Sequence, residues 1–248
     1  MCNRSDNPVA SDAINRRCFL GMPTAVAAVG LVGGGLWISA ARADALTKEQ
    51  RDKMTPDEIL AVMKRGNERF RKGELGKRDY LAEQKASAKG QYPAAALLTC
   101  IDSRAPAEVI MDLGLGDVFN ARVAGNIANV DILGSLEFAC KVAGAKVILV
   151  MGHTACGAIQ GATDKVELGN LTALLARIAP AVKATTFDGE RTSKNPAYVD
   201  AVARKNVELT MALILKESAV LRDLQSKKAV KVAGAMYNLE TAKVDFFD

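Results

Sequence analysis

Two cysteines and one histidine are the residues of this chain whose types and spacing could do chemistry. Cys100 opens the segment Cys-Ile-Asp-Ser-Arg, and His153 and Cys156 form a His-x-x-Cys pattern further along the chain. Two thiolates and one imidazole are a set of three zinc ligands. Catalytic zinc sites keep three protein ligands and an open fourth position, whereas structural sites close with four. The set therefore predicts one zinc ion per chain and an enzyme.

His153 is the only histidine in 248 residues, and an isolated histidine is usually structural. The cysteine three positions later, and the distant cysteine beside Asp102 and Arg104, favour a metal ligand instead. Because Cys100, Asp102 and Arg104 are spaced by two residues, we expect their side chains to project from one face if the strand geometry continues. Arg104 could then hold Asp102 in a bidentate pair beside the metal. The alternative is a surface ion pair in a solvated turn.

A disulfide between Cys100 and Cys156 is an alternative use of the two thiols. Removal of the first 43 residues would leave these two and Cys140, an odd number that fits no disulfide framework. The disulfide would also leave His153 and Asp102 without a role. The two cysteines are not a C-x-x-C pair, which argues against a redox function.

The first 43 residues are typical of an export signal that is cleaved. They contain the twin-arginine pattern Asn-Arg-Arg-Cys-Phe-Leu at 15–20, a Gly/Ala-rich apolar stretch over 23–38, and Ala-Arg-Ala at 41–43, an A-x-A cleavage site. Cleavage after Ala45 is an alternative. A transmembrane anchor is the other interpretation, but the stretch is shorter than the ~20 apolar residues of a span. We therefore expect a periplasmic or secreted protein with no stable membrane anchor.

Residues 44–248 are predicted to form a single α/β domain. The whole chain is 49% hydrophobic, which is enough for a full core, and its formal net charge of +5 is too small to indicate a nucleic-acid partner. A capping box at 55–58 begins an N-terminal helical arm over 55–90. The alternation of strands and helices beyond it predicts a mainly parallel sheet flanked by helices, with a C-terminal edge hairpin.

The expected elements place the candidate ligands at one edge of this sheet. Because Cys100 ends one strand and His153 follows another, both should lie at the carboxyl edge, where open α/β sheets bind ligands. The predicted strands are 94–99, 118–124, 146–151, 230–237 and 242–247, and the predicted helices begin at 55 or cover 78–89, 106–113, 131–143, 168–182 and 198–225.

Three segments resemble the β-class carbonic anhydrases: Cys-Ile-Asp-Ser-Arg at 100–104, Arg-Val-Ala-Gly-Asn at 122–126 and Gly-His-Thr-Ala-Cys-Gly at 152–157. The resemblance extends from about residue 55 to the C-terminus and includes Gly-Asn-Glu-Arg-Phe at 66–70. It implies zinc-dependent, reversible hydration of carbon dioxide to bicarbonate and a proton by zinc-bound hydroxide, in a homodimer or larger homo-oligomer. Related enzymes hydrolyse carbonyl sulfide or carbon disulfide, and a non-catalytic zinc-binding protein is an alternative of another class.

The resemblance also implies roles for the ligands and their neighbours. Cys100, His153 and Cys156 would bind zinc. Asp102 and Arg104 would be the catalytic pair at the open position, and Asp102 would be a fourth ligand in an inactive state if it swings to the metal. Because two thiolates give zinc more electron density than two imidazoles, we expect activity to favour alkaline pH. Because the sole histidine is a ligand, another group or the buffer must carry the released proton.

Three further residues match positions of the family that surround the substrate. Gln91 matches a glutamine that contacts substrate from the neighbouring subunit, and its alternative is a solvated loop. Phe119 and Phe138 match positions that line the apolar pocket, and their alternative is core packing. Many members have tyrosine where this chain has Phe138, so any role of that hydroxyl is absent here.

Overall fold

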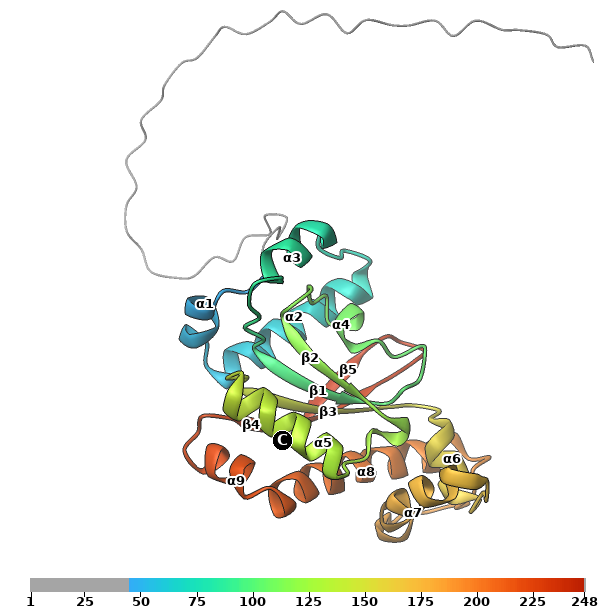
Figure 1. Cartoon of the computed structure of the whole chain (residues 1–248). Helices are drawn as coiled ribbons and strands as arrows, with labels where there is room; N and C mark the ends of the chain where they lie inside the picture. Colours follow the sequence, from blue (N-terminus) through green and yellow to red (C-terminus); the bar gives the residue numbers. More distant parts are fainter. Residues whose placement is uncertain (1–44, 248) are drawn as a thin grey trace, which may run out of the picture. The chain divides into compact units, whose positions relative to one another are not determined.

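The computed structural model describes residues 45–247, and five strands form a single sheet within them (Figure 1). The strand order is β2-β1-β3-β4-β5; β1 to β4 run parallel and β5 is antiparallel at one edge. This confirms the predicted mainly parallel sheet with a C-terminal edge hairpin. The strands are β1 Ala95–Thr99, β2 Val118–Arg122, β3 Val147–His153, β4 Lys231–Tyr237 and β5 Val244–Phe247.

Helices cover both faces of the sheet (Figure 1). A 3₁₀ turn, η1 (Ala124–Asn126), follows β2, and a π-helical turn, η2 (Phe138–Val142), continues α5. The helices are α1 Lys48–Lys53, α2 Pro56–Lys72, α3 Tyr80–Ser87, α4 Ala107–Ile110, α5 Val130–Glu137, α6 Gly157–Thr163, α7 Gly169–Ala184, α8 Pro196–Glu217 and α9 Ala219–Ser226.

Alternate side chains of the central strands enter two different cores. Leu97 and Leu149 pack with α2 and α4, whereas Leu98 and Val150 pack with α5, η2 and α8. Every residue of β1 and β3 is buried, as expected for parallel strands covered on both faces. A third cluster, from α6, α7 and α8, packs around Cys100 and Cys156 beyond the carboxyl end of these strands. The candidate ligands Cys100 and Cys156 are therefore packed among the hydrophobic side chains of these helices.

Two buried acidic groups pair with arginines of α2 and of the segment between α2 and α3. The side chain of Asp112 accepts a hydrogen bond from Arg69 Nε at 2.6 Å and lies 3.6 Å from Arg78 Nη2. Arg78 also pairs with Glu83 of α3 at 3.1 Å. Because Asp112 and Glu83 are buried, their charges need these arginine partners.

The helix predicted over 198–225 is wrong in one respect, because the chain leaves helical geometry at Ser218. The Oγ of Ser218 accepts a hydrogen bond from the N–H of Leu221 and donates one to Glu137 of α5. Serine competes for backbone hydrogen bonds and is favoured at the first position before a helix. Ser218 therefore ends α8 and begins α9.

Several other boundaries differ from those predicted. The capping box of Thr55 and Glu58 is confirmed, but a second one at Thr47 begins α1, which was not predicted. The short helix α6 was also missed, and β3 extends through His153 rather than ending before it. Among residues 45–247, no helix is both long and apolar enough to cross a membrane. The predicted export signal lies outside the described residues.

Candidate metal centre

The three predicted ligands converge at the carboxyl edge of the sheet. Strands β1 and β3 are neighbours in register, with Thr99 opposite Met151, so Cys100 follows β1 directly beside the end of β3. His153 is the last residue of β3, and Cys156 precedes the first residue of α6. The ligand atoms of the three residues lie within 4.8 Å of one another, and all three side chains are buried. The predicted ligand set is therefore gathered in space.

The donor atoms fit a zinc ion. The Sγ atoms of Cys100 and Cys156 are 4.0 Å apart and both thiols are free, so the alternative of a disulfide, with a bond near 2.05 Å, does not apply. His153 Nδ1 lies 2.9 Å from the carbonyl oxygen of Thr154, which can only accept, so Nδ1 carries the proton. The Nε2 of His153 is buried and has no hydrogen-bond partner. One imidazole lone pair and two sulfurs thus face a shared position, as in zinc sites.

The two thiols affect each other's ionisation. A hydrogen bond from Cys156 lowers the pKa of Cys100 to about 4, and His153 and the N–H of Gly125 assist. The same bond, together with burial, raises the pKa of Cys156 above its ordinary value. Two adjacent thiolates repel each other unless a cation lies between them. The pair therefore calls for a metal ion before both can ionise.

The segment Arg122–Asn126 holds the Cys100 loop in place. Arg122 Nε donates to the carbonyl oxygen of Cys100 at 2.9 Å, and its Nη2 donates to that of Asp102 at 2.6 Å. The N–H of Gly125 lies 3.3 Å from Cys100 Sγ. Gly125 has φ +68°, and an added Cβ would lie 2.5 Å from Cδ1 of Ile178. Only glycine satisfies both the backbone angle and this close approach.

Asp102 and Arg104 form the predicted bidentate pair, but in a turn. Asp102 Oδ1 accepts from Arg104 Nε at 3.0 Å and from the Arg104 N–H at 2.9 Å, while Oδ2 accepts from Nη2 at 2.8 Å. The strand ends at Thr99, so the strand geometry on which the expected projection from one face depended does not continue along 100–104. The Arg104 guanidinium holds the pKa of Asp102 well below its usual range. Asp102 Oδ2 lies 3.8 Å from His153 Nε2, which places an ionised carboxylate beside the ligand set.

The three predicted pocket residues are not all brought together in one chain. Phe119 and Phe138 contact each other edge to face, with ring centroids 6.1 Å apart, and Phe138 is 51% exposed. Gln91 is exposed and precedes β1, whereas Cys100 follows β1. The glutamine thus lies at the opposite edge of the sheet from its own ligand set. Its contact with substrate stays a prediction that needs a second chain.

Sequence reasoning missed one carboxylate that touches the ligand-bearing turn. Asp200 of α8 accepts a hydrogen bond from the N–H of Ala155 at 3.1 Å. Burial raises the pKa of Asp200 above its ordinary value. No spacing or motif separates it from the other acidic residues of the chain, so only the fold reveals the contact.

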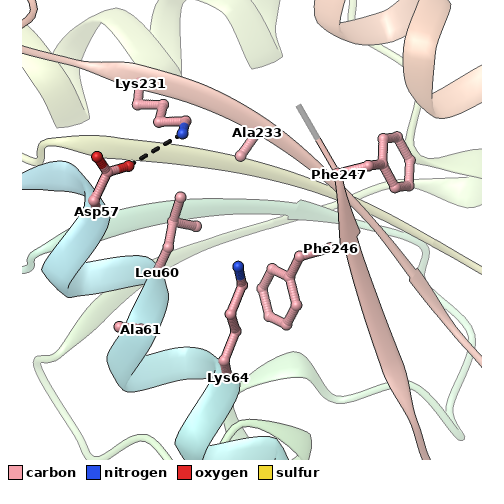
Figure 2. A pocket seen from close by; sticks show the side chains of 8 residues that line it. All are labelled: Asp57, Leu60, Ala61, Lys64, Lys231, Ala233, Phe246 and Phe247. Atoms are coloured by element: carbon pink, nitrogen blue, oxygen red, sulfur yellow. Dashed lines mark hydrogen bonds and ion pairs between the residues drawn. The ribbon is translucent and has the colours of Figure 1, made fainter.

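A groove of about 270 Å³ lies between α2 and the β4–β5 hairpin, apart from the metal ligands (Figure 2). Lys231 begins β4 and pairs with Asp57 at 3.1 Å, and Lys64 Nζ lies 5.4 Å from the ring centroid of Phe246. Because Lys231 opens β4 and His153 ends the neighbouring parallel strand β3, the groove is at the amino end of these strands. None of the predicted site residues lines it.

Known proteins match both the sequence and the fold. Residues 95–244 match the carbonic anhydrase family model. Carbonic anhydrase 2 of Mycobacterium tuberculosis is 32% identical over 188 residues, which cover 73% of this chain and 88% of that protein. A carbonic anhydrase of Pseudomonas aeruginosa is 30% identical over 172 residues, covering 66% and 77%.

Solved structures share the fold at lower identity. The β-carbonic anhydrase CafA of Aspergillus fumigatus superposes with a TM-score of 0.60 at 22% identity, covering 77% of this chain and 90% of that one. A tetrameric β-carbonic anhydrase of Sordaria macrospora gives 0.57 at 24%, covering 64% and 83%. Together with the ligand set at the sheet edge, these matches show that the chain belongs to the β-class carbonic anhydrase family.

Proposed function

We propose that this chain is a zinc carbonic anhydrase, which interconverts carbon dioxide and bicarbonate. The observation that carries the proposal is the buried group of Cys100, His153 and Cys156, with an ionised Asp102 beside it. These three residues would hold the zinc ion, and the named relatives of this chain are carbonic anhydrases. Zinc, when bound, lowers the pKa of a coordinated water so that hydroxide is available near neutral pH.

The Asp102–Arg104 pair supplies the polar side of the site. Asp102 is a hydrogen-bond acceptor at neutral pH, because Arg104 keeps its pKa low. It can accept a hydrogen bond from the O–H of water or bicarbonate and thereby orient that oxygen. The Arg104 side chain is 58% exposed, so its charge also faces solvent, where the anionic product leaves. Asp102 thus orients the oxygen of water or bicarbonate, and the positive charge of Arg104 attracts the bicarbonate anion.

Release of the proton requires a carrier other than histidine. His153 is the only imidazole in the chain, and its Nδ1–H is bound to the carbonyl oxygen of Thr154. The side chain at 138 is phenylalanine and carries no titratable hydroxyl. We expect turnover at saturating carbon dioxide to rise with the concentration of imidazole buffer. A rate that is independent of buffer would mean an internal route through carboxylates or tyrosines.

The test compares two cysteine variants of similar burial. Cys100→Ser removes a ligand, whereas Cys140→Ser changes a buried thiol on η2 that lies outside the ligand group. We expect Cys100→Ser to lose stoichiometric zinc and stopped-flow hydration of carbon dioxide, and Cys140→Ser to keep both. Equal hydration by parent and Cys100→Ser would contradict the proposal. Zinc without hydration, or hydrogen sulfide release from carbonyl sulfide or carbon disulfide in its place, would favour the alternatives.

A homo-oligomer completes the site in this proposal. The apolar side chains of Val130 in α5 and of Phe138 and Val142 in η2 are exposed. Exposed apolar surface indicates a protein interface. Gln91 lies at the far edge of the sheet from its own ligands, so a second copy is needed to bring a glutamine near them. The S. macrospora structure with the same fold is described as tetrameric.

Light scattering measures the size of the assembly, and an active-site complementation test shows whether two chains share a site. We expect Phe138→Asp to shift the zinc-loaded protein toward monomer and to lower hydration activity. Mixing Gln91→Ala chains with Cys100→Ser chains should restore part of the activity. In a mixed oligomer, one site combines the intact Cys100 of the first chain with the intact Gln91 of the second. A fully active monomer would exclude the shared site.

Export by the twin-arginine route is the remaining part of the proposal. Its support is the sequence pattern at 15–20 and the Ala-Arg-Ala site at 41–43. Because that route carries folded proteins, the thiols would be bound to metal before they reach an oxidising compartment. Replacing both Arg16 and Arg17 with lysine should keep the protein in the cytoplasm of a bacterial host. Mass spectrometry of the exported parent should find Asp44 at the N-terminus, or Leu46 if cleavage follows Ala45.

A further inference from the structure

The turn between His153 and Cys156 is held by a carboxylate that is neither a predicted zinc ligand nor part of the Asp102–Arg104 pair. Asp200 lies on α8, is half-buried, and accepts the N–H of Ala155 at 3.1 Å. Ala155 has φ +52°, an unfavourable angle for a residue with a side chain. This geometry persists only when neighbouring contacts determine it. Asp200 is one of those contacts.

A single peptide group connects Asp200 to the zinc ligand. The peptide between Thr154 and Ala155 donates its N–H to Asp200, and its carbonyl oxygen accepts from His153 Nδ1 at 2.9 Å. Because a peptide is planar, fixing the direction of its N–H also fixes the direction of its carbonyl. The carboxylate, the peptide and the imidazole therefore form one chain of hydrogen bonds that ends at the buried Nε2 of His153.

We propose that Asp200 is a positioning residue for His153 and acts through the 154–155 peptide. In many zinc sites a carboxylate accepts directly from a ligand histidine, which fixes the ring and raises its basicity. Here a peptide lies between the carboxylate and the imidazole. The negative charge of Asp200 polarises this peptide, which strengthens the hydrogen bond that its carbonyl oxygen accepts from His153 Nδ1–H. The proposal rests on the zinc site of the proposed function, but it does not depend on which substrate that site uses.

Other contacts of the turn do not replace this one. The N–H of Thr154 donates to the carbonyl oxygen of Tyr237 at 2.9 Å, and the N–H of Leu239 donates to Thr154 Oγ1 at 3.0 Å. Both hold Thr154 against the β4–β5 hairpin, but neither binds the N–H of Ala155. Loss of the Asp200 carboxylate would therefore free the peptide to rotate while the rest of the turn stays attached.

The sole histidine makes a direct measurement simple. In zinc-loaded protein labelled with ¹⁵N-histidine and carrying no histidine tag, every imidazole signal belongs to His153. We expect a slowly exchanging, downfield Nδ1–H in the parent. In Asp200→Asn, which keeps an oxygen acceptor but loses the charge, the proton should move upfield and exchange faster, and Asp200→Ala should enlarge both changes. Glu208→Gln, a matched loss of charge at a partly exposed residue of α8 that pairs with Lys205, should change neither.

Zinc release to a chromogenic chelator provides a second measurement. We expect release from Asp200→Ala to be about 10–100 times faster than from the parent, with Asp200→Asn in between. Unchanged Nδ1–H signals and release rates in both variants would overturn the proposal, as would a parent whose Nδ1–H exchanges freely, even if neither variant folds. Neither measurement uses carbon dioxide, so a failure of the proposed function would be seen separately in the hydration assay.

Discussion

Gly125→Ala tests whether close packing at η1 supports the metal centre. The new Cβ would lie 2.5 Å from Cδ1 of Ile178 and would stand on a backbone with φ +68°. The left-handed angle costs a residue with a side chain roughly 1 kcal/mol, and an overpacked core typically costs about 1–3 kcal/mol. We expect the free energy of unfolding to fall by about 2–4 kcal/mol, measured by urea denaturation at fixed protein and zinc concentrations. Zinc release should also accelerate, because the N–H of Gly125 contacts Cys100 Sγ.

A double-mutant cycle separates the two causes. Ile178→Val removes the Cδ1 atom that the new Cβ meets, and alone it should cost about 0.5–1.5 kcal/mol. In the double variant the overlap disappears, so the combined loss should be smaller than the sum of the single losses by about 1 kcal/mol or more. Gly134→Ala is the control, because a Cβ on this helical glycine of α5 meets nothing within 4 Å. Additive losses in the cycle, or equal stability of parent and Gly125→Ala, would refute the packing argument.

Three further predictions concern ionised or ionisable groups. Asp112→Ala leaves Arg69 without its carboxylate partner and leaves Arg78 with Glu83 alone, and it should lower the free energy of unfolding by roughly 3 kcal/mol, with faster hydrogen exchange in α3; unchanged exchange would contradict this. Burial raises the pKa of Cys140 to about 12, so peptide mapping after iodoacetamide treatment at pH 8 should find this cysteine unmodified in folded protein. Arg104 holds the pKa of Asp102 below its unfolded value near 4, so this carboxylate stabilises the fold above that pH and loses its effect as the pH falls further. Arg104→Gln should raise the Asp102 midpoint, followed by ¹³C NMR, by about one pH unit, and an unchanged midpoint would reject the pair as its cause.

The order of strands and helices was predictable because local patterns carry it. The apolar runs at β1 and β3 are buried on both faces, so nearly every side chain in them is hydrophobic and the strands are plain in the sequence. The break at Ser218 was missed because the helical pattern continues across it. The hydrogen bond from Ser218 to Glu137 stabilises the break between α8 and α9, and these two residues are far apart in the chain.

The ligand set was predictable from residue types, whereas its supports were not. Cysteine and histidine are rare enough here that their spacing alone indicates a metal. Arg122 and Asp200 act through backbone carbonyl and N–H groups of the ligand segments, and such contacts leave no pattern in one sequence. The sequence left open whether 100–104 continues the strand or forms a turn, because Asp102 and Arg104 can pair in either geometry; the structure has the turn.

The position of the metal centre beyond the sheet follows from the alternation of side chains. Cys100 shares its parity with Leu98, and His153 shares its parity with Met151, and these two neighbours pack on opposite faces of the sheet. Within a regular sheet Cys100 and His153 would therefore point away from each other. They meet because both stand where the strands end, with Cys156 entering from the first turn of α6. A shared ion is thus geometrically permitted only at the edge, which is also where one position can stay open to solvent and substrate.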